Sequence, residues 1–202
     1  KYFLSKPNVG NILVRIITEN LKAELEFECD SIDMLQLYPS NYERFKAMPK
    51  YAGRIVDIPA LNTWYIGFNN QAAPFNDVKV RRALNLLLDK DKIIKAIYSG
   101  RAVPAIGSIP PGISGFNGKD TGIGFNPEEG KRLLAEAGYN EQKPLKIELY
   151  HKAQQAASEI TRFIQGEFKK YSVIIETKPM EWSALKDAIN KGEAKAFLMN
   201  WF

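Results

Sequence analysis

The stretch from Asn62 to Asp89, NTWYIGFNNQAAPFNDVKVRRALNLLLD, decides the fold. Residues 63–69 mix aromatic and β-branched side chains and end in Asn-Asn, which predicts a strand that runs into a turn. Pro74 breaks any regular element, and Asp77 can cap a helix by accepting a hydrogen bond from a free backbone N–H. The apolar residues then recur at the spacing of one helix face: Val80, Ala83, Leu84, Leu87 and Leu88. The sequence therefore predicts a strand, a proline-containing turn and a capped amphipathic helix.

Elements of both kinds are predicted on either side of this stretch. Before it, the pattern predicts strands at 11–17, 32–37 and 53–58 and helices at 19–27 and 41–48. After it come a helix capped by Asp89 or Asp91 and stopped at Gly100, and a proline- and glycine-rich excursion at 101–124. Helices are then predicted from Asn126, at 155–170 and at 180–190, and strands at 144–150, 172–177 and 194–202. Because strands and helices alternate, we expect an α/β layered domain with parallel pairings.

Composition limits the class of protein. The chain has 202 residues, is 45% hydrophobic and 25% charged, and carries a net charge of +5. It can bury a real core, and no apolar run approaches the roughly 18 residues that a membrane span needs. The basic residues are scattered rather than clustered, so we expect a solvated surface and no nucleic-acid partner.

The sequence offers no positive case for catalysis. It contains no Gly-x-Ser-x-Gly elbow and no phosphate-binding loop, and Gly122-Ile123-Gly124 lacks the rest of a dinucleotide fingerprint. The single cysteine, Cys29, excludes an internal disulfide and a cysteine cluster for zinc, and we expect it to be a buried thiol. The single histidine, His151, is expected to be a polar residue at a strand end. The sequence predicts no enzyme, cofactor or metal site.

Large aromatic residues do stand at predicted strand ends. Trp64 and Tyr65 share one strand, and Trp201 and Phe202 end the last one. Such rings often line ligand clefts at the ends of α/β sheets, and the alternative for each ring is an ordinary place in the core.

A collinear series of motifs resembles the bacterial extracellular solute-binding proteins of family 5, the oligopeptide-, dipeptide- and nickel-binding receptors of ABC importers. The motifs are YIGFN at 65–69, Pro74-Phe75, Asp77, Val80-Arg81, Ala83-Leu84, Asp89-Lys90, GRA at 100–102, Pro104-Ala105, IPPG at 109–112, Asn126-Pro127-Glu128, LLAEAGY at 133–139, Glu181-Trp182 and Trp201. Their order, more than any single motif, carries the resemblance.

The resemblance implies a fold and an extent. Family members have two α/β lobes joined by crossing strands, with the ligand enclosed between them. We therefore expect residues 1–202 to be one lobe of a type II periplasmic-binding-protein-like fold, with a mixed sheet flanked by helices. This would be the central lobe of a longer receptor, and the other lobe would be absent from this chain.

The resemblance also implies a function. The expected role is the substrate-binding component of an ABC import system, which captures peptides or a related small solute by hinge closure. The implied partners are the solute and the transporter's membrane subunits, and the protein would be a monomer. It would be periplasmic or extracellular, and membrane-attached if it is a lipoprotein. The alternative is a sensor or enzyme domain that reuses the same lobe.

The expected ligand contacts lie mainly at the end of the last strand, at Asn200, Trp201 and Phe202. In peptide-binding members this strand reads Trp-x-x-Asp, and the acidic position would fall just beyond Phe202. Tyr65 and Asn69 are further candidates. We assign Asp77 and Arg81 to capping and packing.

Overall fold

The computed structural model describes residues 8–58 and 60–201. The chain divides into two compact units, Lys1–Ala52 and Gly53–Phe202. Two helices form the regular part of the first unit, α1 (Asn20–Glu28) and α2 (Pro39–Ala47), and a short 3-10 turn, η1 (Pro49–Tyr51), follows.

An aromatic cluster holds the first unit together. The ring centroids of Phe27, Phe45 and Tyr51 lie 5.3–6.0 Å apart, and Phe45 is 1% exposed. Arg44 of α2 crosses to α1, where it donates to Glu24 and Glu28 at 2.5 Å. Together the rings and this forked ion pair join α1 to α2.

Three predicted strands are wrong, those at 11–17, 32–37 and 53–58. None of these segments forms a strand in the structure, and Leu13 and Ile16 are 86% and 92% exposed. β-branched residues favour extended backbone, but a strand also needs a partner to complete its ladder, and the described residues supply none there. The prediction for Cys29 is also wrong, because this thiol is exposed at the C-cap of α1.

The second unit is built on a four-stranded sheet with the order β1-β4-β2-β3. Its strands are β1 (Thr63–Phe68), β2 (Leu145–Lys152), β3 (Val173–Met180) and β4 (Ala196–Trp201). β2 is parallel to both β3 and β4, whereas β1 is antiparallel to β4. The prediction of a mixed α/β sheet is therefore confirmed.

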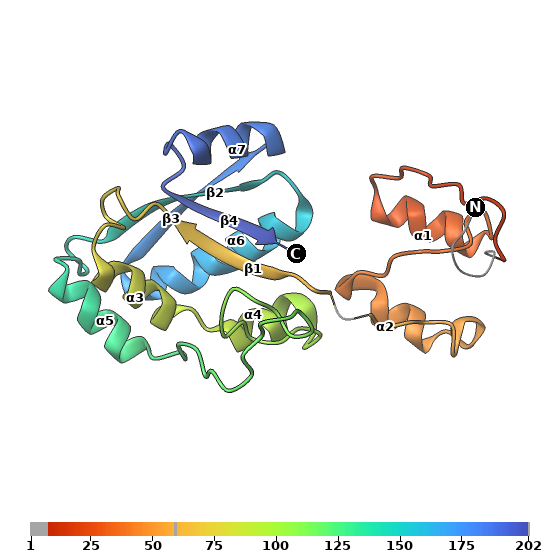
Figure 1. The fold of residues 1–202 in the computed structure, drawn as a ribbon, viewed down its shortest axis with the longest axis horizontal. Helices are drawn as coiled ribbons and strands as arrows, with labels where there is room; N and C mark the ends of the chain where they lie inside the picture. The colour runs from red at the N-terminus through yellow and green to blue at the C-terminus, as the bar shows by residue number, and fades with distance from the viewer. Residues whose placement is uncertain (1–7, 59, 202) are drawn as a thin grey trace. The chain divides into compact units, whose positions relative to one another are not determined.

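Helices cover both faces of this sheet (Figure 1). On one side lie α3 (Val78–Leu87), α4 (Lys90–Tyr98), α5 (Pro127–Glu136) and α6 (Gln155–Phe168), which ends in the 3-10 turn η2 (Lys169–Tyr171). On the other side lies α7 (Trp182–Asn190). The two crossovers run in opposite directions along the sheet, so right-handed connections place α6 and α7 on opposite faces.

The apolar core lies between the sheet and the larger group of helices. Leu149, Ala196 and Leu198 of the sheet join Leu84 of α3 and Ile160 of α6 in one buried cluster. The predicted amphipathic face of α3 is confirmed, since Val80, Ala83, Leu84 and Leu87 are buried.

Side chains cap the first turns of α3, α4 and α5. Asp77 accepts a hydrogen bond from the Lys79 backbone at 2.8 Å, and Asp89 and Asn126 cap α4 and α5 in the same way. Arg81 donates to the Phe75 carbonyl at 2.6 Å, which ties α3 to the turn before it. The scaffold roles predicted for Asp77 and Arg81 are thus confirmed.

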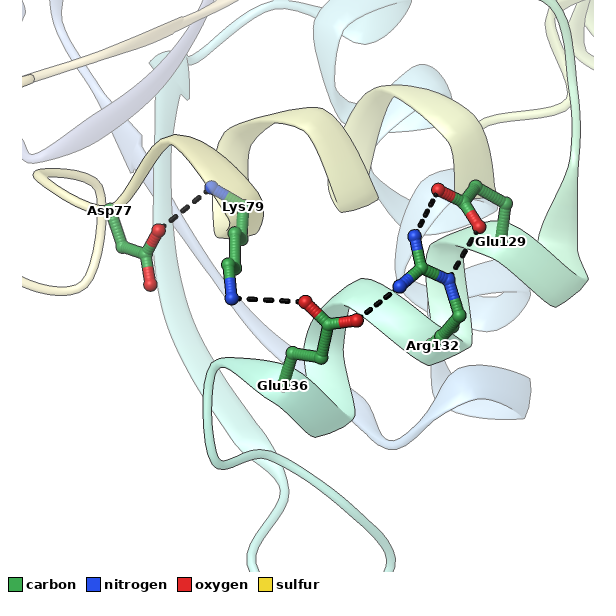
Figure 2. Close-up of polar contacts among 5 residues, drawn as sticks. All are labelled: Asp77, Lys79, Glu129, Arg132 and Glu136. Atoms are coloured by element: carbon green, nitrogen blue, oxygen red, sulfur yellow. Dashed lines mark hydrogen bonds and ion pairs between the residues drawn. The ribbon is translucent and has the colours of Figure 1, made fainter.

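Ion pairs join α3 to α5 on the outside of the unit (Figure 2). Lys79 lies 2.9 Å from Glu136, and Arg132 bridges Glu136 and Glu129, the latter at 2.7 Å. The hydrogen bond from Lys79, followed by the charges of Arg132 and Lys79, lowers the pKa of Glu136. The fork from Arg132 likewise lowers the pKa of Glu129.

These shifts predict a pH dependence. A carboxylate whose pKa is lower in the folded state stabilises the fold above its unfolded pKa of about 4.5, and this contribution is lost as the pH falls through the folded pKa. Glu136→Gln should therefore lower the melting temperature slightly at pH 7, and the variant and parent should converge toward about pH 3. Thermal melts across this range measure the difference. Glu141→Gln, in the exposed loop before β2, is the control, and an equal loss for both variants at pH 7 would contradict the prediction.

The segment 101–124 forms no helix or strand, as its prolines and glycines predict. Lys90 of α4 donates to the Ile123 carbonyl at 2.9 Å, and partial burial lowers the pKa of this lysine. The C-terminal end of this segment is therefore attached to α4.

Candidate functional site

The carboxyl ends of the parallel strands meet at one edge of the sheet. β2 ends at Lys152, β3 at Met180 and β4 at Trp201, and α6 and α7 begin directly after β2 and β3. In open α/β sheets, ligands bind outside this edge. The two described residues of the predicted strand-end site, Asn200 and Trp201, both lie here.

A hollow of about 340 Å³ opens at this edge, and we refer to it as the edge hollow. Its volume lies at the lower end of the range for small-molecule sites. It is lined by Trp64, Lys152, Gln154, Ala157, Trp182, Leu185, Leu198, Met199, Asn200 and Trp201.

The pleat of β4 divides the edge hollow between the two faces of the sheet. Leu198 and Ala196 belong to the buried core on the α6 side, and alternation places Asn200 on that side too. Met199 and Trp201 consequently lie on the α7 side. Trp64 pairs with Asn200 across β1 and β4, so it shares the α6 side.

One side of β4 has no strand partner where β4 borders the edge hollow. β1 pairs with β4 along its whole length, from Ala196 to Trp201. On the other side, the last partners of β4 and β2 are Leu198 and His151. β2 continues beside β3 instead, and the Ala153 amide donates to the Met180 carbonyl at 2.7 Å. Among the described strands, none pairs with this side of residues 199–201, so the backbone groups there can accept a further strand.

Two lysines lie at or near the edge hollow. Among the described residues, Lys152 is the one charged residue in its lining, and the Lys186 ammonium lies 5.5 Å from the ring centroid of Trp182. Next to Trp64, burial raises the pKa of the Tyr98 hydroxyl, and the negative charge of Glu159 raises this pKa further. The hollow thus combines indole surface with a lysine and with amide groups from Asn200 and Gln154.

The other candidates for ligand contact lie elsewhere. Tyr65, 37% exposed, lies on the α7 face of β1, where its ring meets Phe197 edge-on at 6.5 Å. Asn69 follows the far end of β1, and its Oδ1 accepts from the Gln71 backbone at 3.0 Å. Neither lines the edge hollow. Phe202 lies outside the described residues, so it remains a prediction.

His151 is buried, at 2% exposed, and its Nδ1 lies 2.9 Å from the Lys152 carbonyl oxygen. It does not line the edge hollow. This matches the expected polar residue at a strand end. In the part of the chain that the structure describes, no three His, Cys, Asp or Glu side chains gather as a metal site would require.

Several lining residues were missed from the sequence. Lys152 is the last residue of β2, Gln154 directly precedes α6, and Leu185 lies in the first turn of α7. Their position at the carboxyl ends of strands is the signal that could have identified them. Trp182, in the helix predicted at 180–190, is a further lining residue, and its side chain is 38% exposed. It stands at the first position of α7.

The whole chain, residues 1–202, matches the model of the bacterial extracellular solute-binding proteins, family 5, middle part. The chain belongs to this family. Among curated relatives, it is 28% identical to the dipeptide-binding protein of Escherichia coli (strain K12) over 205 residues, which is 99% of this chain and 38% of that protein. It is also 28% identical to heme-binding protein A of Haemophilus influenzae, covering 99% of this chain and 37% of that protein.

A solved structure of a periplasmic binding protein also matches the fold of this chain. The ABC-transporter-associated periplasmic binding protein DppA of Helicobacter pylori, in complex with the peptide STSA, superposes with a TM-score of 0.80 at 25% identity. The match covers 93% of this chain and 36% of that structure. The chain thus spans less than two fifths of the length of these relatives, and it has the fold of the corresponding part of a periplasmic binding protein.

Proposed function

We propose that this chain is part of the substrate-binding component of an ABC import system and that its edge hollow contacts a peptide or a related small solute. Membership of family 5 supports this role, as do relatives whose names specify dipeptide and heme binding. The described residues contain no helix of the length and hydropathy that crossing a membrane would require.

The observation that carries the proposal is the unpaired side of β4 at residues 199–201. An extended peptide can add to an exposed sheet edge, where main-chain hydrogen bonds supply affinity that depends little on the side chains. The ligand would take the place beside β4 that β2 leaves when it ends its pairing at His151. Lys152 stands at that point and can attract a carboxylate of the ligand.

In this proposal, residues 1–202 are the central lobe of a two-lobe receptor. Hinge closure against the other lobe would bury the ligand and complete its contacts. The receptor would work as a monomer with the importer's membrane subunits. It would lie in the periplasm or outside the cell, attached to the membrane if it carries a lipid anchor.

Backbone methylation of the ligand tests the proposed pairing. A tripeptide such as Ala-Ala-Ala should bind the intact protein in calorimetry, and N-methylation of the amide that faces β4 should weaken binding about tenfold or more. Such a methyl group removes a donor and leaves a buried acceptor unpaired, which costs about 1–3 kcal/mol.

The matched control is the same methylation at the neighbouring amide, which points away from β4. This methylation removes no hydrogen bond to β4 and should change the affinity much less. If both methylated peptides bind as well as the parent, the strand-addition mode is wrong. If no tripeptide binds at all, a peptide is not the solute.

A further inference from the structure

The segment 101–124 contains the one Asn-Gly pair of the sequence, Asn117-Gly118. Both residues are exposed, and the segment around them forms neither helix nor strand. In such a pair the backbone nitrogen of the second residue can attack the side-chain carbonyl carbon of the first, because the new bond closes a five-membered ring. Glycine carries no Cβ beside the attacking nitrogen, so it obstructs this approach least.

The local hydrogen bonds leave the attacking nitrogen free and engage the carbonyl group that it would attack. Asn117 Oδ1 accepts from the Lys119 backbone N–H at 3.2 Å, as in a side-chain turn of asparagine. In the part of the chain that the structure describes, no hydrogen bond uses the Gly118 N–H. A donor on Oδ1 stabilises the negative charge that this oxygen gains during the attack. The turn therefore favours ring closure.

We propose that Asn117-Gly118 is a site of spontaneous deamidation, with water as the co-reactant. Solvent base removes the Gly118 amide proton, and the nitrogen then forms a bond to Asn117 Cγ. The Cγ–Nδ2 bond breaks, and Nδ2 takes a proton from water and leaves as ammonia. Water hydrolyses the cyclic imide at one of its two carbonyl groups, so residue 117 becomes aspartate or isoaspartate. No group is oxidised or reduced.

Either product changes this part of the surface. Each one carries a carboxylate in place of a neutral amide, so the net charge of +5 falls by one. The isoaspartyl product also routes the main chain through Cβ. This lengthens the backbone at the turn in which the Asn117 carbonyl oxygen accepts from the Asp120 amide at 3.2 Å.

Asn140 provides a comparison inside the same molecule. It is exposed, and its Oδ1 accepts from the Gln142 backbone at 3.0 Å, which is the same side-chain turn as at Asn117. The residue that follows it is Glu141, whose Cβ crowds the attacking nitrogen. A difference in rate between the two asparagines therefore reports the residue that follows, and not exposure or the turn alone.

The experiment is incubation of the intact protein at mildly alkaline pH, with tryptic digestion and mass spectrometry of samples taken at successive times. The tryptic peptide 102–119 contains one asparagine and no glutamine, so its mass gain reports Asn117 alone. We expect Asn117 to convert about tenfold or more faster than Asn140. The rate should rise with pH, because the attacking nitrogen must lose its proton. Equal rates at the two asparagines would overturn the proposal, as would conversion of Asn117 only after unfolding in urea.

Gly118→Ala tests the role of the glycine. The added Cβ would lie 3.3 Å from Phe116 Cε1, a contact that a small shift of this ring relieves. The variant should melt like the parent and convert Asn117 about tenfold more slowly, with the rate at Asn140 unchanged. An isoaspartyl methyltransferase, which labels isoaspartate but not aspartate, should label the incubated parent more than the variant. An unchanged Asn117 rate in the variant would overturn the proposed chemistry.

Discussion

Replacing Phe75 with alanine should lower the free energy of unfolding by about 3–5 kcal/mol. Phe75 lies in the proline-containing turn before α3 and is 2% exposed. Its ring stacks on that of Phe68 at the end of β1, with centroids 4.7 Å apart and planes at 24°. Truncation removes this ring from the junction of sheet and helix and leaves a cavity that the neighbouring turn cannot fill.

Denaturant unfolding followed by tryptophan fluorescence measures this effect, because all three tryptophans lie in the second unit. Phe125→Ala is the matched control. Phe125 is 44% exposed and precedes the cap of α5, so its loss should cost at most about 0.5 kcal/mol. Similar losses for the two variants would show that Phe75 is not a core residue.

The second large effect is expected at Gly130, where α5 packs against α3. A Cβ added at Gly130 would lie 2.7 Å from Leu87 Cγ and Cδ2 and 3.3 Å from the Ala83 carbonyl oxygen. Leu87 is 1% exposed, so it has little room to move. Gly130→Ala should therefore force the two helices apart and lower the free energy of unfolding by about 1–3 kcal/mol.

This loss is notable because the same substitution usually stabilises a helix by about 1 kcal/mol. Gly166 of α6 provides the comparison, since nothing lies within 4 Å of an added Cβ there. Gly166→Ala should raise the free energy of unfolding by about 0.5–1 kcal/mol. Opposite signs for the two alanine variants support close helix packing at Gly130, and equal signs would contradict it.

The second unit could be predicted well because its signals are local. The Asp77, Asp89 and Asn126 caps each stand next to an apolar face of helical period, and the structure contains all three helices. Alternating strands and helices from β2 onward also predicted the parallel pairings. Each of these elements finds its partner within the same unit, so local pattern and final packing agree.

The first unit shows where local signals are insufficient. Residues 11–17 have the composition of a strand, but no strand lies beside them in the described part of the chain. A strand is a property of two segments, and the sequence of one segment cannot report on the other.

The edge hollow was only half predictable for a related reason. Asn200 and Trp201 could be predicted as ligand contacts because the last strand resembles the ligand-contacting strand of the family. Lys152 and Trp182 come from two other segments, which the order β1-β4-β2-β3 brings together. No periodicity within any one of them indicates this meeting.

The one-sided pairing of β4 at residues 199–201 has a consequence for the lifetimes of its amide protons. Amides that point toward β1 lie in a ladder and should exchange slowly with solvent, whereas those that point into the edge hollow should exchange almost as fast as in an unfolded chain. A bound strand would slow only the second set and leave the alternate amides unchanged. Proton exchange along these few residues would thus record which side of the strand is occupied, independently of how tightly the ligand is held.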